Sequence, residues 1–310
     1  MRRFPSRHSL QIALLLFLSA AHPAGAEEYP LTQIAAGVYL HRGAQQDASP
    51  ANQGRIANTG FIVGERQVAV IDSGGSLREG QALRRALRRV TDLPIAYVIL
   101  THVHPDHVLG ASAFEQDDPE FIGHANLPDA LARRGRYYLE RLPAVLGERS
   151  RGTRLILPSS TVADTRELDL GDRILRLTAY ATAHTNNDLS VLDIRTGTLW
   201  LSDLLFVERI PVVDGSLLGW LRVMDRLSSL DLQLVVPGHG PQVAAWQNAL
   251  ANQRRYLERL AHGIRSVIAE GGTIKQALAV VALEEKDNWL LFDDYHGRNV
   301  TTGFVELEWE

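Results

Sequence analysis

One short run of the sequence concentrates histidine and aspartate directly after an apolar segment. Residues 97–101 form an apolar, β-branched segment, and His102, His104, Asp106 and His107 follow it. Such a segment is typical of a buried strand, and open α/β folds build their sites at the carboxyl ends of strands. The run therefore predicts a site at the edge of a sheet in an α/β fold, and it constrains the fold more than any other feature.

Three further candidate ligands, His184, Asp203 and His239, each follow an apolar, strand-like segment. These segments are residues 174–181, 198–202 and 232–236. Together with residues 97–101 they predict four strand ends that converge on one rim. Gly238 and Gly240 flank the last histidine and permit a tight loop where the backbone passes close to the site.

Imidazole and carboxylate are the ligands that zinc takes when no thiolate is offered, and the chain contains no cysteine. His102 and His104 are two residues apart, so they face the same side of an extended backbone. Pro105 ends strand pairing and turns the chain, which directs Asp106 and His107 toward a second point. The seven candidate ligands can therefore hold two zinc ions with a water between them.

The first residues have the pattern of a cleaved signal peptide. Arg2, Arg3 and Arg7 form a basic start, residues 10–21 form a short apolar stretch, and Ala24-Gly25-Ala26 is a small-residue cleavage site. The apolar stretch is too short to span a bilayer. We expect cleavage after residue 26 and export to the periplasm by the Sec route, because the arginine pair lacks twin-arginine spacing; a retained anchor is the alternative.

Removal of residues 1–26 makes the chain more acidic. Lysine plus arginine falls from 32 to 29 while aspartate plus glutamate stays at 36, so the formal net charge changes from −4 to −7. This argues against nucleic acid or anionic lipid as a partner, because both require a basic face. Without disulfides, stability has to come from core burial. We expect residues 27–310 to form a single domain that acts on a small molecule and has no membrane span.

Hydrophobic periodicity predicts strands and helices in each of two similar halves. The first half has an antiparallel meander at 37–40, 60–63 and 68–71, a helix at 77–89, the strand before the ligand run and a helix at 128–146. The second half has strands from 162 to about 203, a helix at 217–227, a strand before the last histidine and a helix at 242–270. This order predicts an α/β fold of four layers, an αββα sandwich.

The His-x-His-x-Asp-His run, followed by a lone histidine, an aspartate and a last histidine, resembles the signature of the metallo-β-lactamase superfamily. The resemblance covers residues 38 to about 240. It implies two zinc ions per chain, with Asp203 as their bridge. It also implies one ion bound by His102, His104 and His184, and a second bound by Asp106, His107 and His239.

Asp72 follows the strand-like segment 68–71, where superfamily members support the ligand run from behind. Its carboxylate can accept a ring or backbone N–H and so orient a ligand. Turn chemistry in Asp-Ser-Gly-Gly is the alternative, and the two roles can coexist.

The charge at this site favours hydrolysis. Two zinc ions, Asp106, Asp203 and a bridging hydroxide leave a net positive charge, which suits an anionic transition state. Zinc lowers the pKa of bound water toward about 7, and Asp106 is placed to orient the hydroxide and transfer its proton. We therefore predict a zinc-dependent hydrolase, with Asp106 catalytic, that cleaves an ester, thioester, lactone or lactam.

Residues 202–220 and 291–299 resemble a narrower group, the SoxH-related quinoprotein relay system zinc metallohydrolases. This resemblance implies a functional link to a periplasmic quinoprotein dehydrogenase and names no substrate. Ala183, Asn187 and Ser202 depart from the superfamily pattern, since many members carry glycine there. The departures bear on loop shape and leave the ligands unchanged.

Six residues are candidates for shaping substrate choice. They are Tyr137, Tyr138 and Arg141 on the helix at 128–146, Asn186 and Asn187 beside the lone histidine, and His296 in the tail. The helix residues can form a lid, with an ordinary solvated helix face as the alternative. The asparagines can donate to an oxyanion, although loop asparagines more often cap their own backbone. The tail histidine either reaches the site or lies on a surface loop.

Three other functions remain alternatives. A β-lactamase proper is disfavoured, because Asp203 stands where cysteine-using lactamases place that ligand. A non-catalytic periplasmic metal-binding accessory protein would not need every ligand. A mononuclear iron enzyme similar to persulfide dioxygenases needs one redox metal, whereas this chain offers a complete second site. Because the same ligands accept iron and manganese, metal content separates these functions.

Overall fold

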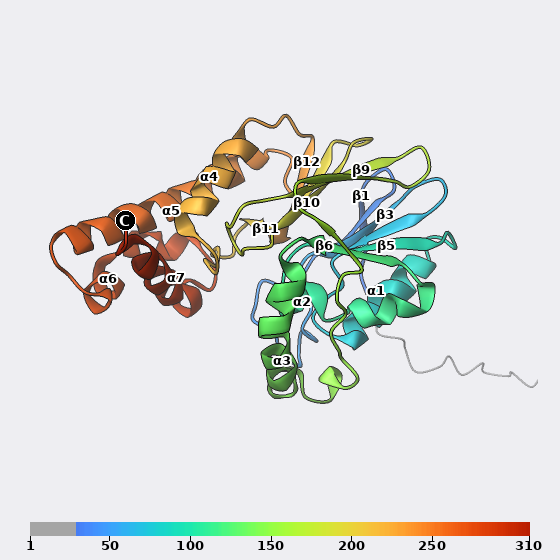
Figure 1. Cartoon of the computed structure of the whole chain (residues 1–310), viewed down its shortest axis with the longest axis horizontal. Helices are drawn as coiled ribbons and strands as arrows, with labels where there is room; N and C mark the ends of the chain where they lie inside the picture. Colours follow the sequence, from blue (N-terminus) through green and yellow to red (C-terminus); the bar gives the residue numbers. More distant parts are fainter. Residues whose placement is uncertain (1–28) are drawn as a thin grey trace, which may run out of the picture.

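The computed structural model describes residues 29–310, so the predicted signal peptide at residues 1–26 lies outside the described residues. In that range no helix combines the length and apolarity needed to cross a membrane. The described chain forms two β-sheets with helices packed on both sides of the pair (Figure 1).

The first sheet has seven strands, and their spatial order is their order in the sequence. Neighbouring strands are antiparallel from β1 to β4 and parallel from β4 to β7. The predicted meander is confirmed and corresponds to β2, β3 and β4. The strands are β1 (Thr32–Ala35), β2 (Val38–His41), β3 (Thr59–Val63), β4 (Val68–Ile71), β5 (Ile95–Leu100), β6 (Glu120–His124) and β7 (Ser160–Val162).

The second sheet has five strands in the order β12-β11-β10-β9-β8. Strands β8 to β11 are antiparallel neighbours, and β12 pairs in parallel with β11. The strands are β8 (Thr165–Asp169), β9 (Ile174–Ala179), β10 (Leu189–Asp193), β11 (Thr198–Phe206) and β12 (Leu234–His239).

Helices of the first half cover the outer face of the first sheet. They are α1 (Leu77–Arg88), α2 (Pro105–Val108), the 3-10 helix η1 (Ala111–Asp117), α3 (Leu127–Leu146) and the 3-10 helix η2 (Gly147–Ser150). Helix α1 starts at Ser76, whose hydroxyl accepts a hydrogen bond from the Glu79 amide at 3.2 Å. Its apolar residues recur at helical spacing and are buried against strands β4 and β5.

Helices of the second half gather at the other end of the molecule, beyond β11 and β12 (Figure 1). They are α4 (Leu217–Ser228), α5 (Trp246–Ala269), α6 (Ile274–Val280), the 3-10 helix η3 (Leu283–Asn288) and α7 (Phe292–Leu307). Trp220, Trp246 and Tyr256 are fully buried among them, in one cluster with Leu199 and Val235 of the second sheet. Burial of such large side chains is what holds this layer to the sheet.

A third apolar cluster fills the space between the two sheets. Ile62 and Ile71 of the first sheet lie in it with Leu177, Val191 and Trp200 of the second. All are essentially inaccessible to solvent. The arrangement of helices, sheet, sheet and helices confirms the predicted αββα sandwich.

Two of the predicted strand ends are wrong in detail. Strand β11 continues through Asp203 to Phe206, and β12 continues through His239. The cause lies at Ser202, which has a left-handed backbone with φ of 49°. The register of β11 with β12 shifts on both sides of this residue, so the strand bulges where it presents Asp203 and then resumes pairing.

Candidate functional site

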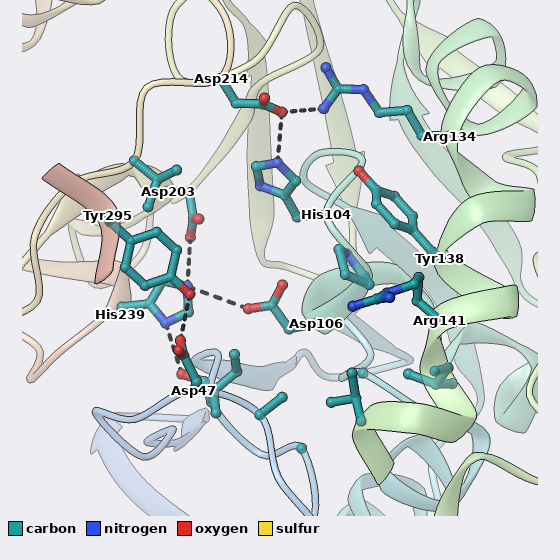
Figure 2. Close-up of a pocket in the computed structure, with 18 of the residues that line it drawn as sticks. Asp47, His104, Asp106, Arg134, Tyr138, Arg141, Asp203, Asp214, His239 and Tyr295 are labelled. Carbon is teal, nitrogen blue, oxygen red and sulfur yellow. Dashed lines mark hydrogen bonds and ion pairs between the residues drawn. The ribbon is translucent and has the colours of Figure 1, made fainter. Parts of the chain in front are cut away.

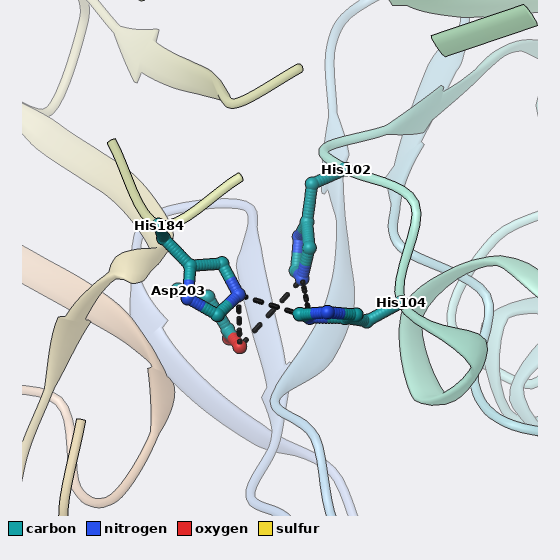
Figure 3. A group of neighbouring side chains, drawn as sticks. All are labelled: His102, His104, His184 and Asp203. Atoms are coloured by element: carbon teal, nitrogen blue, oxygen red, sulfur yellow. Dashed lines mark hydrogen bonds and ion pairs between the residues drawn. The ribbon is translucent and has the colours of Figure 1, made fainter. Parts of the chain in front are cut away.

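The structure brings the seven candidate ligands together in two clusters. They are His102, His104, His184 and Asp203 in one, and Asp106, His107 and His239 in the other. Within each cluster the ligand atoms lie within 4.8 Å of one another. Figure 2 shows Asp106, His239 and Asp203 facing one another, and Figure 3 shows the other cluster. This partition matches the two ligand sets that the superfamily resemblance implies.

Asp203 stands between the clusters and faces each with a different oxygen. Its Oδ2 lies 3.3 Å from His184 Nε2 and 3.6 Å from His102 Nε2. Its Oδ1 lies 3.2 Å from His107 Nε2 and 3.6 Å from His239 Nε2. A carboxylate with this orientation can bridge two cations. Gly238 makes the arrangement feasible, because a Cβ atom on it would overlap Oδ1 of this aspartate.

The ligand run owes its shape to Pro105. Strand β5 ends at Leu100, and His104 is the residue that precedes α2. Pro105 occupies the first position of that short helix, where its missing N–H costs nothing. The turn that follows carries Asp106 and His107 into the second cluster, as the sequence predicts.

Backbone carbonyls orient two of the histidines. The Nδ1 atom of His184 lies 2.7 Å from the Val212 carbonyl, and that of His239 lies 2.8 Å from the Ile56 carbonyl. A carbonyl only accepts, so Nδ1 carries the proton and donates. The Nε2 atom of each ring then carries no proton and is directed into its cluster, which is the form that binds a metal.

Asp72 plays the same part for His107. Its Oδ2 accepts from His107 Nδ1 at 2.8 Å, and its two oxygens accept from the Thr101 amide and hydroxyl, each at 2.9 Å. The Ser202 hydroxyl also donates to Oδ2 at 3.3 Å. Asp72 thus sits behind the ligand run as expected, and its left-handed φ of 55° shows that it is a turn residue as well.

The donor atoms fit a divalent cation. His107 Nε2 and Asp203 Oδ1 are buried, have no hydrogen-bond partner among the described residues, and face each other at 3.2 Å. With Nδ1 donating to Asp72, both atoms are acceptors, and a cation between them would satisfy both. Burial lowers the pKa of His102 and of His104, which favours the neutral imidazole that metals require. Nitrogen and oxygen donors in this number suit zinc.

A cavity of about 930 Å³ opens onto the clusters. His104, Asp106, His184, Asp203 and His239 lie in its wall, so the candidate ligands are accessible to a small molecule. Helix α3 forms one side of the cavity (Figure 2). All three helix residues predicted as a lid, Tyr137, Tyr138 and Arg141, line it.

Asp214 is a site residue that the sequence did not reveal. His104 Nε2 lies 3.0 Å from Asp214 Oδ2, and Arg134 pairs with the same oxygen (Figure 2). Arg298 donates to Asp214 Oδ1 at 2.7 Å. Burial alone would raise the pKa of Asp214, but the hydrogen bonds from His104 and Arg134 outweigh it and hold that pKa low. Asp214 lies within residues 202–220, which carry the narrower resemblance, but nothing in that stretch singles it out, because its three partners come from distant parts of the chain.

Asn186 and Asn187, considered for an oxyanion role, bond within their own loop. Neither is among the residues that line the cavity. Asn187 is buried, its amide donates to the Thr185 hydroxyl at 3.1 Å, and its side chain donates to Asn186 Oδ1 at 2.8 Å. This bonding within the loop agrees with the alternative prediction, although Asn187 Oδ1 is buried without a hydrogen-bond partner among the described residues.

Both predictions for His296 are wrong. The residue is buried in α7, with Nε2 2.9 Å from the Val281 carbonyl and Nδ1 3.1 Å from the Tyr256 hydroxyl. Its neighbours Tyr295 and Arg298 line the cavity instead. Both belong to residues 291–299, which carry the narrower resemblance, so this stretch was informative although the wrong residue was singled out.

Comparison with known proteins agrees with this geometry. A family model described as the metallo-beta-lactamase superfamily matches residues 52–239. A stretch of 58 residues is 33% identical to a linear primary-alkylsulfatase from Pseudomonas sp. (strain ATCC 19151). That match covers 19% of this chain and 11% of the sulfatase, so the chain spans only a small part of this relative.

Two solved structures illustrate the likeness in fold. The inverting sec-alkylsulfatase Pisa1 from Pseudomonas sp. superposes with a TM-score of 0.71 at 15% identity, over 89% of this chain and 50% of that one. A metallo-beta-lactamase from Pontibacter korlensis superposes with a TM-score of 0.58 at 17% identity, over 74% of this chain and 98% of that one. With most of the chain matched by the family model and the ligand signature in place, the chain belongs to the metallo-beta-lactamase superfamily.

Proposed function

We propose that the protein is a hydrolase that holds two zinc ions and cleaves an ester, thioester, lactone or lactam. The observation that carries this proposal is the position of Asp203, whose two oxygens face two separate sets of ligands. The buried acceptor atoms His107 Nε2 and Asp203 Oδ1 face each other without a hydrogen-bond partner, which supports the presence of a cation between them.

The chemistry needs a nucleophile at neutral pH and a counter-charge for an oxyanion. Two bound zinc ions would supply both, since they lower the pKa of a shared water and stabilise negative charge on the substrate oxygen. The oxygen of water adds to the carbonyl carbon, the bond to the leaving heteroatom breaks, and the leaving group receives a proton.

Asp106 is the residue of this chain best placed to move that proton. Its Oδ2 lies 3.4 Å from His239 Nε2 and 3.7 Å from His107 Nε2, and the residue lines the cavity. A carboxylate in this position can orient a water through one oxygen and accept its proton. Asp106 thus serves as ligand and as general base in the proposed reaction.

Hydrolysis of a sulfate ester is a second candidate. It is favoured by the sequence match to a linear primary-alkylsulfatase and by the superposition on Pisa1, which covers more of this chain than that on the Pontibacter lactamase. Water would attack sulfur or the ester carbon, the bond from that atom to the bridging ester oxygen would break, and the products would be an alcohol and hydrogen sulfate. The two candidates differ in substrate and share the metal clusters.

The test combines metal content with turnover. Inductively coupled plasma analysis of the purified protein should find about two zinc ions per chain. The protein should then turn over at least one member of a panel of lactones, thioesters, cephalosporins and alkyl sulfates. Asp106→Ala should lower kcat by at least about 100-fold, whereas Asp225→Ala, at an exposed aspartate of α4 that pairs with Arg254 outside the cavity wall, should leave it unchanged.

The other results of this test point to the alternatives. Turnover confined to the cephalosporin would indicate a β-lactamase proper. One iron ion per chain would indicate an enzyme similar to persulfide dioxygenases. Two zinc ions without turnover of any panel member would indicate a metal-binding accessory protein.

We also propose that the protein acts in the periplasm, in company with a quinoprotein dehydrogenase. Support comes from the signal-peptide pattern and from the resemblance of residues 202–220 and 291–299 to the quinoprotein relay group. Mass spectrometry of the protein from a periplasmic fraction should show a chain that starts at Glu27. Deletion of the gene should lower dehydrogenase activity in the same fraction, and unchanged activity would remove the link.

A further inference from the structure

The cavity above the metal clusters is far more basic than the protein as a whole. The full chain has a formal net charge of −4, yet five arginines and four aspartates line the cavity, with no lysine or glutamate among its described lining residues. Two of the aspartates, Asp106 and Asp203, belong to the clusters and would be offset by bound metal. Without these two, five arginines face two aspartates in the cavity wall, an excess of positive charge that attracts an anion.

Most of these arginines already have a partner. Arg134 and Arg298 pair with Asp214, and Arg133 lies 3.7 Å from Asp129. Such a pairing cancels much of the charge that each arginine presents to a ligand.

Arg209 is likewise tied into the wall. It donates to the Tyr295 hydroxyl at 3.1 Å and lies 3.5 Å from Asp47, and Tyr295 donates to Asp47 at 2.5 Å. These three residues come from separate parts of the chain, and Tyr295 and Asp47 lie beside His239 (Figure 2). Arg209 is therefore held in the cavity wall by Tyr295 and Asp47.

Arg141 differs from the other four. Within residues 29–310 no acidic group lies within ion-pair distance of it, and it makes no hydrogen bond to another side chain or to the backbone. Its guanidinium extends from α3 into the cavity, on the side of Asp106 (Figure 2). An arginine in this state offers its full set of planar donors to a carboxylate, sulfate or sulfonate.

Helix α3 becomes apolar directly after Arg141. Leu142, Val145 and Leu146 line the cavity beside Ile56 and Ala48 of the preceding loop. Leu142 and Leu146 belong to the apolar cluster under α3, and Val145 and Ala48 pack against it. Val145 lies four residues after Arg141, and Leu142 lies three residues before Val145, so these side chains share adjoining faces of the helix. The unpaired cation and the apolar wall therefore lie next to each other in the cavity.

We propose that the substrate is an anionic amphiphile, with its anionic group on Arg141 and its hydrocarbon chain against Leu142, Val145 and Leu146. This inference rests on the proposed function for the identity of the reacting bond, but the binding site itself does not require turnover. The bond to be cleaved lies at the metal clusters, and the anionic group and chain set which molecules are accepted.

The test measures binding of compounds that cannot be hydrolysed. Isothermal titration of the zinc-loaded full-length mature protein uses octanesulfonate, octanoate, butanesulfonate and 1-octanol. Octanesulfonate or octanoate should bind at least about ten-fold more tightly than 1-octanol, since a hydrogen bond to a charged group has that worth. Octanesulfonate should also bind more tightly than butanesulfonate, because four more methylenes are buried.

Variants then assign the two contacts. Arg141→Gln should weaken binding of the anionic compounds about ten-fold and leave 1-octanol unchanged. Arg136→Gln is the matched control, because Arg136 lies on the exposed side of α3 and pairs with Glu140. Val145→Ser should narrow the difference between octanesulfonate and butanesulfonate.

The outcomes separate this inference from the proposed function. Unchanged octanesulfonate and octanoate affinity in Arg141→Gln, equal affinity for the two sulfonates, or no binding at all would overturn the anionic amphiphile. If binding depends on Arg141 but no ester or sulfate is turned over, the proposed binding site would be supported and the proposed hydrolase activity would be contradicted. A preference for octanoate over octanesulfonate, or the reverse, would tell which anion the substrate carries.

Discussion

At the scale of the residue, the centre depends on acceptors placed behind the ligands. Asp72 accepts one hydrogen bond from His107 Nδ1 and two from the amide and hydroxyl of Thr101. Ser202 stands where superfamily members often carry glycine. Its φ of 49° is in the left-handed region that glycine adopts readily, which explains why glycine is common there. Here its hydroxyl lies 2.8 Å from that of Thr101. A departure from the family pattern thus adds a contact to the support of the ligand run.

Replacement of Asp72 by asparagine should weaken the metal centre without unfolding the protein. Asparagine tolerates the left-handed backbone at this position, but its amide cannot serve both His107 Nδ1 and the two donors of Thr101. We expect Asp72→Asn to lower zinc affinity about 10- to 100-fold, measured by competition with a chromogenic chelator. Asp169→Asn, at an exposed ion pair with Arg66, is the control and should bind zinc as the wild type does.

At the scale of the element, α4 and α7 are joined at the segment that carries Asp214. The Ser216 hydroxyl accepts from the Gly219 amide at 2.8 Å and so caps the first turn of α4. Glu306 of α7 accepts from the same hydroxyl and from the Leu217 amide, each at 2.6 Å. The negative charge of this carboxylate also interacts favourably with the dipole of α4 at the amino terminus of that helix. Both helices therefore determine where the chain after residue 213 runs.

Removal of this cap should destabilise the protein measurably. Ser216→Ala loses the acceptor for Gly219 and the donor to Glu306, so we expect a free energy of unfolding lower by about 1–2 kcal/mol. Urea denaturation followed by circular dichroism measures this quantity. Ser228→Ala, at the exposed end of the same helix, should change it by less than about 0.5 kcal/mol; equal effects would mean that the cap contributes nothing.

At the scale of the whole molecule, buried acids link global stability to pH. Glu79 of α1 is buried, and its oxygens accept from the Gly75 amide at 2.8 Å and from the Tyr29 hydroxyl at 3.2 Å. Burial raises the pKa of Glu79 from 4.5 to about 8. The folded protein therefore holds a proton that the unfolded chain releases, and this contribution to stability falls as pH rises from about 4.5 to about 8.

The pH dependence should disappear when Glu79 can no longer ionise. We expect the wild type to lose about 2 kcal/mol between pH 5.5 and 7.5 relative to Glu79→Gln, with both proteins stripped of metal and unfolded in urea. Glu167→Gln, at an exposed ion pair, should follow the wild type. Parallel curves for wild type and Glu79→Gln would show that Glu79 is ionised in the folded state.

Patterns that are local in sequence were sufficient for much of the fold. The helix at 77–89 corresponds to α1, the helix at 128–146 to α3 and the helix at 217–227 to α4, each within one residue. Period and capping residues act over a few neighbours, so these elements can be predicted from them. The strand ends near Asp203 and His239 could not be predicted in this way, because the bulge at Ser202 depends on pairing between β11 and β12.

By itself the sequence determined the chemistry of the site: which histidines and aspartates gather, that no thiolate joins them, and that Pro105 divides the run between two clusters. These features follow from residue type and short spacing. Tertiary structure alone decided what surrounds them. Asp214 meets Arg134 and Arg298 across 80 and 84 positions, and Tyr295 meets Asp47 across 248. Such contacts exist only after sheets and helices have packed, because no local pattern records which distant side chains share a cavity.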